Sequence, residues 1–199
     1  HEGRAVGVAE IQPRVAWISG DVLGDSTFER FVSTLAELPS LEWAQTANAG
    51  LDHPAYAQLA RSGMQFSKSG AQSIAISEYV LGYALAHAQG LDLRRKAQAD
   101  RRWQPHRFDE LWHSRWLIVG YGHIGRNVAK RAKAFDCHTT IVRREATADE
   151  YADVVIALDD VRDHLPGADV IVLACPATAE TRGLVDGSFL EMAKETSIL

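Results

Sequence analysis

Short apolar runs alternate along this chain with segments in which apolar residues recur at helical spacing. In the first 72 residues, the runs 14–19, 41–46 and 64–67 predict strands, because glycine, proline or polar turn residues bound each of them. Apolar positions recur every three or four residues in 28–38 and 54–61, which predicts two helices. Alternation of strand and helix predicts a parallel sheet.

A much longer helical segment begins at Ser73. Residues 74–88 are apolar over much of the helix surface, whereas residues 90–102 are polar and rich in lysine and arginine. We expect one helix that ends before Trp103 and Pro105, with its apolar part buried between layers or against a second subunit. The basic part is interpreted as a solvated helix face rather than a phosphate or nucleic-acid site.

The second half repeats the alternation of strand and helix. Strands are predicted at 116–119, 139–142, 154–158 and 168–174, helices at 126–135, 160–165 and 188–194, and a further strand from Ser197. The sequence therefore predicts an α/β fold, with a Rossmann-type doubly wound parallel sheet in residues 73–199, where the long helix comes first. Residues 1–72 are predicted to form a smaller, separate α/β domain.

The segment Gly120-Tyr121-Gly122-His123-Ile124-Gly125 lies between a predicted strand and a helix. In this context the pattern G-x-G-x-x-G indicates a dinucleotide site rather than an ordinary glycine turn. We expect Gly120 to allow the tight turn, Gly122 to let the backbone approach a pyrophosphate, and Gly125 to let the helix pack close to the strand. The helix N-terminus then offers N–H groups and the positive end of its dipole to the phosphates.

Arg143 and Arg144 end the next predicted strand, where an NAD site usually carries an acid about 20 residues after the glycine loop. A carboxylate repels a 2′-phosphate, whereas a guanidinium pairs with it through two hydrogen bonds. We therefore predict NADP(H) as the cofactor in preference to NAD(H). In the alternative, both arginines are exposed to solvent, and Glu145 or a later acid binds the ribose of NAD.

Two loops at the carboxyl ends of predicted strands are candidate ligand contacts, because parallel sheets bind ligands at that edge. The loop 175–181 should face the cofactor, with Thr178 and Thr181 as hydrogen-bond donors. Cys175 has no neighbouring base and is interpreted as a packing residue rather than a nucleophile. The segment Asn48-Ala49-Gly50-Leu51 exposes backbone N–H groups suited to a carboxylate, although a plain strand-to-helix turn explains it equally well.

Composition narrows the class of protein. The net charge of −5 argues against a general nucleic-acid binder. Cys137 and Cys175 fit no metal spacing and are interpreted as free thiols of a reducing compartment, and the eight histidines show no ligand spacing either, so no metal is predicted. No apolar run reaches the roughly 18 residues of a membrane helix. We expect a soluble, cytoplasmic protein that binds neither nucleic acid nor membrane.

Taken together, the sequence resembles the D-isomer-specific 2-hydroxyacid dehydrogenases, especially the glyoxylate/hydroxypyruvate reductase branch. Four stretches carry the resemblance: Ala49-Gly50-Leu51-Asp52, Ser77-Glu78-Tyr79-Val80, and residues 117–125 and 176–199. The resemblance implies reversible hydride transfer between NADP(H) and a small 2-oxo acid. It also implies that residues 1–72 belong to a flavodoxin-like substrate domain and that residues 73–199 bind the cofactor.

The resemblance further implies roles for single residues. Ala49, Gly50 and Leu51 would bind the substrate carboxylate through backbone N–H groups. His123 would contact the cofactor through its backbone, and Ile124 would pack on the nicotinamide side. Arg143 and Arg144 would hold the 2′-phosphate, and the residues lining the cofactor cleft would be Cys175, Pro176 and Thr181.

The catalytic Arg, Glu and His of that family follow the strand that begins at Ser197, and none of the three has a counterpart here. We therefore expect both domains to be incomplete, the chain to be truncated at both ends, and these 199 residues to lack activity although the parent protein is an enzyme. The apolar helix would suit a homodimer. The rival hypothesis is an NAD(H)-sensing, non-catalytic interaction protein of the corepressor type on the same fold; Arg143 disfavours it.

Overall fold

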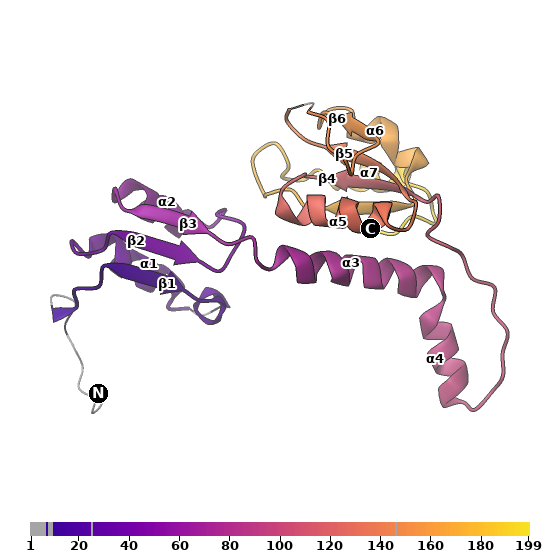
Figure 1. Ribbon diagram of the computed structural model, residues 1–199, viewed down its shortest axis with the longest axis horizontal. Coiled ribbons are helices and arrows are strands. Elements are labelled where there is room, and N and C mark those ends of the chain that lie inside the picture. Colours follow the sequence, from indigo (N-terminus) through magenta and orange to yellow (C-terminus); the bar gives the residue numbers. More distant parts are fainter. Residues whose placement is uncertain (1–6, 8–9, 25, 146) are drawn as a thin grey trace. The chain divides into compact units, whose positions relative to one another are not determined.

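The computed structural model describes residue 7 and residues 10–24, 26–145 and 147–199. The chain divides into two compact units, His1–Gln72 and Ser73–Leu199, and each is described by itself. Both units are built on parallel sheets with helices packed against them (Figure 1). The predicted α/β class is confirmed.

The first unit contains a three-stranded parallel sheet. Its strands lie in the order β1 (Val15–Ile18), β2 (Trp43–Thr46) and β3 (Gln65–Lys68), and they are connected by α1 (Phe28–Glu37) and α2 (Pro54–Arg61). A short 3-10 helix at Gly20–Gly24, which the sequence pattern did not predict, follows β1. All five predicted elements of this unit are present, with ends that shift by no more than two residues.

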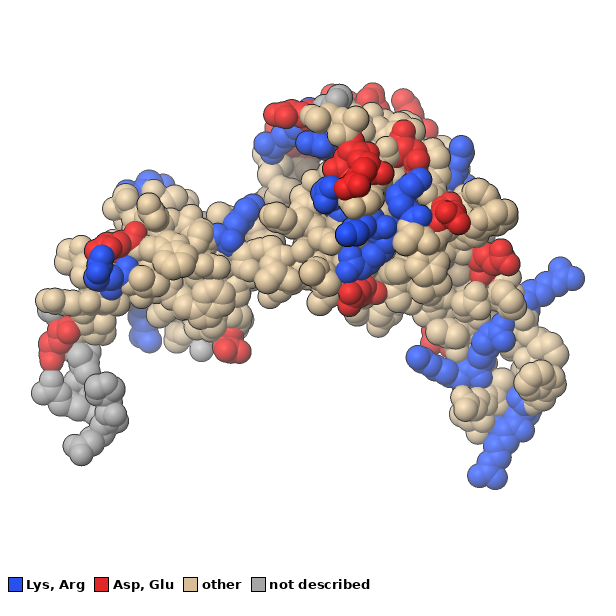
Figure 2. Space-filling model, in the orientation of Figure 1, with Lys and Arg blue, Asp and Glu red and all other residues tan. Residues whose placement is uncertain are grey.

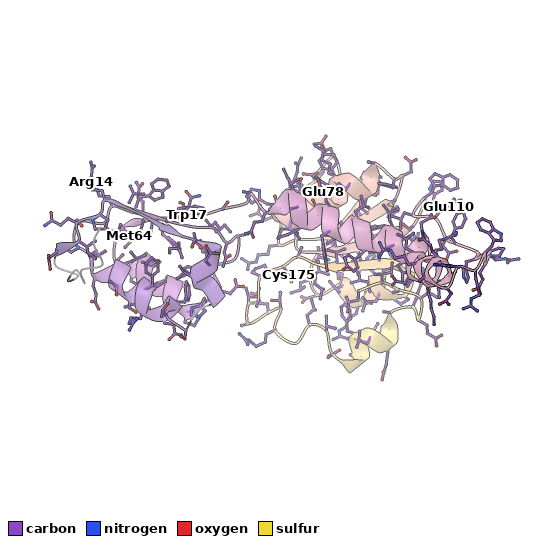
Figure 3. All side chains as sticks on the ribbon, turned by 90° about the horizontal axis from the view of Figure 1, so that it is seen from below. Arg14, Trp17, Met64, Glu78, Glu110 and Cys175 are labelled. Atoms are coloured by element: carbon purple, nitrogen blue, oxygen red, sulfur yellow. The ribbon has the colours of Figure 1, made fainter. Side chains whose placement is uncertain are left out.

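One face of this sheet is packed against the two helices. Ile18 and Ala44 are fully buried in a core with residues of α1 and α2. Because successive side chains of a strand point to opposite faces, Val15 and Trp17 lie on the other face, where each is 56% exposed (Figure 3).

The second unit contains a four-stranded parallel sheet in the order β6-β5-β4-β7. The strands are β4 (Arg115–Val119), β5 (His138–Val142), β6 (Val154–Ile156) and β7 (Val170–Leu173). Ile198 forms a parallel bridge to Val170 on the far side of β7, at the position of the further predicted strand. This order matches strands 3-2-1-4 of the Rossmann order 3-2-1-4-5-6.

Helices cover both faces of this second sheet. On one face lie α3 (Ser73–Ala88) and α5 (His123–Lys133), and on the other lie α6 (Val161–His164), the 3-10 helix η3 (Leu165–Gly167) and α7 (Gly187–Met192). Trp116 and Ile118 of β4 are buried with Val128 of α5, whereas Leu117 is buried with Phe189 of α7. The doubly wound, Rossmann-like arrangement is thus confirmed.

The single helix expected from Ser73 to residue 102 is wrong. The chain forms α3 and a separate helix α4 (Leu91–Ala99), because Gly90 between them has φ 57° and ψ 40°, the left-handed conformation that glycine adopts without strain. Basic side chains of α4 and the following loop protrude at the surface (Figure 2). Glu78 of α3 is 64% exposed and pairs with Arg131 of α5 at 3.1 Å, which joins the two neighbouring helices (Figure 3).

Candidate functional site

The order of the strands reverses at β4, since β5 and β6 lie on one side of it and β7 on the other. The loops that leave the carboxyl ends of β4 and β7 therefore separate, and the crevice between such loops is where open α/β sheets bind ligands. A cavity of about 690 Å³ lies at this edge. Its size falls within the range of small-molecule and cofactor sites.

This cavity brings together residues that are distant in sequence. Six of the ten predicted cofactor residues line it: Gly120, Arg143, Arg144, Cys175, Pro176 and Thr181. The other four, Gly122, His123, Ile124 and Gly125, do not line it and form the beginning of α5. The glycine loop also contributes Tyr121 and the loop after β7 contributes Glu180, whereas the lining residues Ala157, Leu158 and Asp159 after β6 have no motif in the sequence.

The three glycines of the loop have different surroundings. Gly120 has a φ of +98°, and a Cβ there would lie 2.5 Å from the backbone nitrogen of Cys175. A Cβ on Gly125 would overlap the carbonyl oxygen of Gly120, whereas a Cβ on Gly122 would meet nothing within 4 Å. Packing therefore requires glycine at 120 and 125, and the space beside Gly122 is the room that a bound pyrophosphate would need.

Helix α5 begins at His123, and Gly122 is its N-cap residue. The predicted start at Arg126 is wrong, because the last three residues of the glycine loop already form the first helical turn. Gly125 does not end the helix there, since its missing Cβ lets the helix approach β4. The first-turn N–H groups, which have no partner within a helix, thus belong to the last residues of the loop itself.

Ile124 is partly buried against the core that α3 and α5 share with the sheet. This packing holds the first turn of α5 in place. It leaves part of the Ile124 side chain accessible, and no contact among the described residues tests its predicted position beside a nicotinamide.

The two arginines after β5 differ in their surroundings. Arg143 is partly buried: its Nη1 donates a hydrogen bond to the carbonyl oxygen of Thr147 (3.3 Å), and its guanidinium carbon lies 5.8 Å from the centre of the Tyr121 ring. The side chain of Arg144 is 81% exposed and lies 3.9 Å from the Glu180 carboxylate. Arg143 therefore has a defined position at the cavity, whereas Arg144 extends into solvent.

Three carboxylates line the same cavity. Glu145 follows the arginines, Asp159 follows β6, and Glu180 belongs to the loop after β7. These carboxylates can accept hydrogen bonds from the free ribose hydroxyl groups of NAD. The alternative of an NAD site therefore also has candidate residues in this cavity.

The loop after β7 is organised by its threonines. The hydroxyl of Thr181 donates to the carbonyl oxygen of Pro176 (2.6 Å) and accepts a hydrogen bond from the N–H of Thr178 (2.9 Å). The one hydroxyl hydrogen of Thr181 is thus used within the loop, and its expected role as a donor to the cofactor is not supported by this geometry. Cys175 is a free thiol packed partly against the core on the α7 side, as suits a packing residue.

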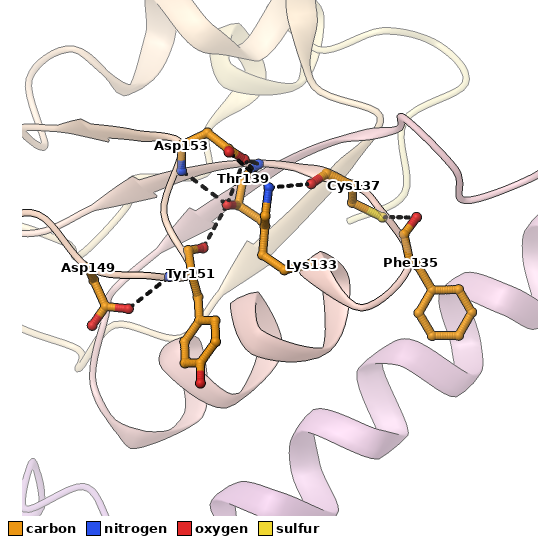
Figure 4. Close-up of polar contacts among 7 residues, drawn as sticks. All are labelled: Lys133, Phe135, Cys137, Thr139, Asp149, Tyr151 and Asp153. Atoms are coloured by element: carbon orange, nitrogen blue, oxygen red, sulfur yellow. Dashed lines mark hydrogen bonds and ion pairs between the residues drawn. The ribbon is translucent and has the colours of Figure 1, made fainter.

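A polar network behind the glycine loop was not evident from the sequence. The Tyr121 hydroxyl donates to Asp149 Oδ1 (2.7 Å), Arg126 Nε donates to Oδ2 (2.9 Å), and the N–H of Tyr151 donates to Oδ1 (3.0 Å; Figure 4 shows this last bond). Asp149 lies 28 positions after Tyr121, at no recognisable motif spacing. Only folding brings the two side chains together.

This network changes the acidity of its members. Burial alone would raise the pKa of Asp149, but hydrogen bonds from the Tyr151 N–H, Tyr121 and Arg126 outweigh it and lower that pKa below its ordinary value. Burial, followed by the hydrogen bond to Asp149, raises the pKa of Tyr121. Asp149 is therefore a carboxylate and Tyr121 a neutral phenol at neutral pH, so the bond between them is charge-assisted.

The predicted substrate residues Asn48, Ala49, Gly50 and Leu51 lie in the first unit, after the carboxyl end of β2. The N–H of Asn48 donates to Thr46 Oγ1 (3.3 Å), and its carbonyl oxygen accepts from the N–H of Ser69 (3.1 Å). Asn48 is thus tied into the turn. The backbone of the next three residues is what remains available for a ligand.

The described residues contain neither a metal-binding cluster nor a membrane-spanning helix. Among the described residues, no three His, Cys, Asp or Glu side chains gather closely enough to hold a metal ion. Of the helices in these parts of the chain, none is long and apolar enough to cross a membrane.

Comparison with known proteins identifies the family. The model of the D-isomer specific 2-hydroxyacid dehydrogenase NAD-binding domain matches residues 81–199, more than half of the chain. The chain belongs to this family. The matched range contains the glycine loop, both arginines and the loop after β7, and the resemblance stated from the sequence is confirmed.

Two solved structures and one curated protein illustrate the kinship. Glyoxylate/hydroxypyruvate reductase A HPR2 of Arabidopsis thaliana is 26% identical over 189 residues, which are 89% of this chain and 57% of that protein. A 2-hydroxyacid dehydrogenase family protein from Aeromonas salmonicida is 27% identical with a TM-score of 0.75, over 94% of this chain and 71% of that one. The family member from Xanthobacter autotrophicus Py2, solved with NADPH and MES, shares the fold at 22% identity (TM-score 0.73, over 97% and 58%).

The chain is shorter than these relatives. It spans little more than half the length of the Arabidopsis reductase that it matches.

Proposed function

We propose that this chain binds NADP(H) as part of an oxidoreductase that transfers a hydride between NADP(H) and a small 2-oxo or 2-hydroxy acid of the glyoxylate or hydroxypyruvate type. Membership of the dehydrogenase family supports the reaction class, and the name of the Arabidopsis relative supports the substrate class. The observation that carries the cofactor assignment is the cavity after β4, which places Gly120 and Arg143 in one site.

The glycine loop and α5 would hold the pyrophosphate. The space beside Gly122 admits a diphosphate, and the N–H groups of the first turn of α5 are oriented as donors by the helix itself. Gly120 would keep β4 in contact with the loop after β7 beneath the pyrophosphate, so that backbone atoms form the floor of the site.

Arg143 would bind the 2′-phosphate of the adenosine ribose. A guanidinium has five N–H donors, and that of Arg143 makes one hydrogen bond among the described residues, to the Thr147 carbonyl oxygen, so several donors remain for a ligand. The Tyr121 ring lies beneath the guanidinium and limits its freedom. Pre-positioning of this kind reduces the entropy lost on binding.

In this proposal residues 1–72 contribute to the substrate site and residues 73–199 to the cofactor site. The backbone N–H groups of Ala49, Gly50 and Leu51 would bind the substrate carboxylate. No general acid is assigned within these 199 residues. A homodimer through α3 belongs to the same proposal, because Tyr79 and Tyr83 of that helix are each more than 60% exposed.

Dinucleotide binding tests the cofactor assignment without requiring turnover. Dissociation constants for NADPH and NADH would be measured by nucleotide fluorescence for the wild type, Arg143→Asp and the matched variant Arg144→Asp. We expect the wild type to prefer NADPH. Arg143→Asp should weaken NADPH binding about 10- to 100-fold, because charged hydrogen bonds are lost, and should change NADH binding little.

The Arg144→Asp variant should lose less, because its side chain is largely exposed. Tighter binding of NADH than of NADPH by the wild type would contradict the NADP(H) assignment and favour the rival NAD(H)-sensing protein. An equal loss of both nucleotides in Arg143→Asp would show that this residue does not read the 2′-phosphate.

A further inference from the structure

A second cavity opens at the opposite edge of the sheet, where β4, β5 and β6 begin. It has a volume of about 340 Å³ and shares no lining residue with the candidate cofactor cavity. Arg115 is the first residue of β4, and Gly120 follows the last. At about 3.3 Å per residue the two cavities are roughly 16 Å apart along the strand, so this is a separate site.

Four polar side chains line this second cavity: Arg115, His138, Thr140 and His164. Arg115 and His138 are register partners on β4 and β5. Thr140 lies two residues further along β5, so all three side chains leave the same face of the sheet. His164, at the end of α6, completes the group from the layer that covers this face.

The position of Arg115 is further defined by Gly167 in η3. The Arg115 Nη1 atom lies 3.6 Å from the position that a Cβ on Gly167 would occupy. The guanidinium therefore extends from the sheet towards η3, where Gly167 also lines the cavity.

No carboxylate lines this cavity among the described residues. The acids that directly precede β6 and β7, Asp153 and Asp169, are paired with lysines. Asp169 accepts the backbone N–H of Arg115 (2.7 Å) and pairs with Lys194 (2.6 Å).

Asp153 accepts the N–H of Thr139 (2.7 Å) and pairs with Lys133 (2.8 Å; Figure 4). Arg115 makes no ion pair in the parts of the chain that the structure describes. Its charge, together with the imidazole and hydroxyl donors around it, is therefore available to a ligand in the cavity.

We propose that this cavity binds a phosphate group, either as inorganic phosphate or as the phosphate ester of a small molecule. A guanidinium fork matches two phosphate oxygens, and each imidazole has at least one N–H donor for the others. The Thr140 hydroxyl can donate as well. The cavity has an arginine and no carboxylate in its lining. The whole chain, in contrast, has a net charge of −5, which disfavours the binding of anions elsewhere on the surface of the protein.

The test uses inorganic phosphate and ethyl phosphate as probes, with malonate as a carboxylate of similar charge, at pH 7 and constant ionic strength. Chemical shifts of the histidine C2–H protons would be followed by NMR during each titration. We expect saturable shifts of His138 and His164, with His106 and His113, which do not line this cavity, as internal controls. Arg115→Gln should weaken phosphate binding about tenfold or more, because a charged hydrogen-bond donor is lost.

Arg143→Gln is the matched control, since its arginine belongs to the other cavity, and it should leave these shifts unchanged. A response to inorganic phosphate alone would indicate the free ion, and a tighter response to ethyl phosphate would indicate an ester. Equal shifts of all histidines, no saturation, an unchanged affinity in Arg115→Gln or a preference for malonate would each overturn the proposal. Because no dinucleotide is present, the outcome is independent of the proposed cofactor.

Discussion

Replacement of Gly120 by alanine should destabilise the second unit severely. The φ of +98° lies where an L-residue is strained, which costs about 1–3 kcal/mol. The new Cβ would also lie 2.5 Å and 2.6 Å from the backbone N and Cα of Cys175. Backbone atoms cannot rotate away, so β7 must shift, and overpacking of this kind costs about 1–3 kcal/mol more.

The two effects add to about 4 kcal/mol, a large share of the 5–15 kcal/mol that stabilises a typical domain. With a urea m-value of about 2 kcal/mol/M, the unfolding midpoint should fall by about 2 M. The assay is urea unfolding followed by tryptophan fluorescence. Trp116 of β4 is only 1% exposed and reports on this sheet, and replacing Trp17 and Trp43 by phenylalanine removes the signal of the first unit.

Gly122→Ala is the control for this prediction. Its φ is −80° and a Cβ would meet nothing within 4 Å, so its free energy of unfolding should match the wild type within about 0.5 kcal/mol, whereas dinucleotide binding should weaken. The steric reasoning fails if Gly120→Ala unfolds at the wild-type midpoint, or if both variants lose the same stability.

Two further predictions concern polar contacts. Tyr121→Phe removes the 2.7 Å hydrogen bond to Asp149 but keeps the ring under Arg143, so it should destabilise the unit by about 1–2 kcal/mol in the same urea assay; an unchanged midpoint would show that the network is not structural. Asp186 caps α7, and hydrogen bonds from the Phe189 N–H, Arg162 and Ser188 lower its pKa from 3.8 to about 2. Since the folded-state pKa is the lower one, this stabilisation is complete above pH 4 and is lost as the pH falls towards 2. The urea midpoint of Asp186→Ala should therefore lie below that of the wild type at pH 7 and approach it near pH 2, and a constant difference across this range would contradict the assignment.

Much of the fold followed from local patterns. Runs of apolar residues located every strand, because strands of a buried parallel sheet have few polar positions. The glycine loop was recognised because its three glycines, the strand before them and the helix after them lie within about 20 residues. Gly90 was misjudged: periodicity continues on both sides of it, and only its left-handed conformation separates α3 from α4.

Some residues of the candidate site could likewise be predicted from local patterns, and others could not. Arg143 and Cys175 were found because each follows the end of a strand, and parallel strands end at one edge. Thr181 does line the cavity, but its hydrogen bond to the Pro176 carbonyl is set by the folded loop and has no local signal in the sequence. Asp149 and Tyr121 gave no signal, because their distance in sequence carries no information about their distance in space.

By itself, therefore, the sequence determined the α/β class, the family and the location of the dinucleotide loop, all of which depend on residues close together in the chain. The tertiary structure decided which residues share a cavity. Strand order places Gly120 against Cys175, and parallel pairing aligns Arg115 with His138 at the opposite edge. Such groupings arise from sheet order and register, which bring residues together that no local pattern relates.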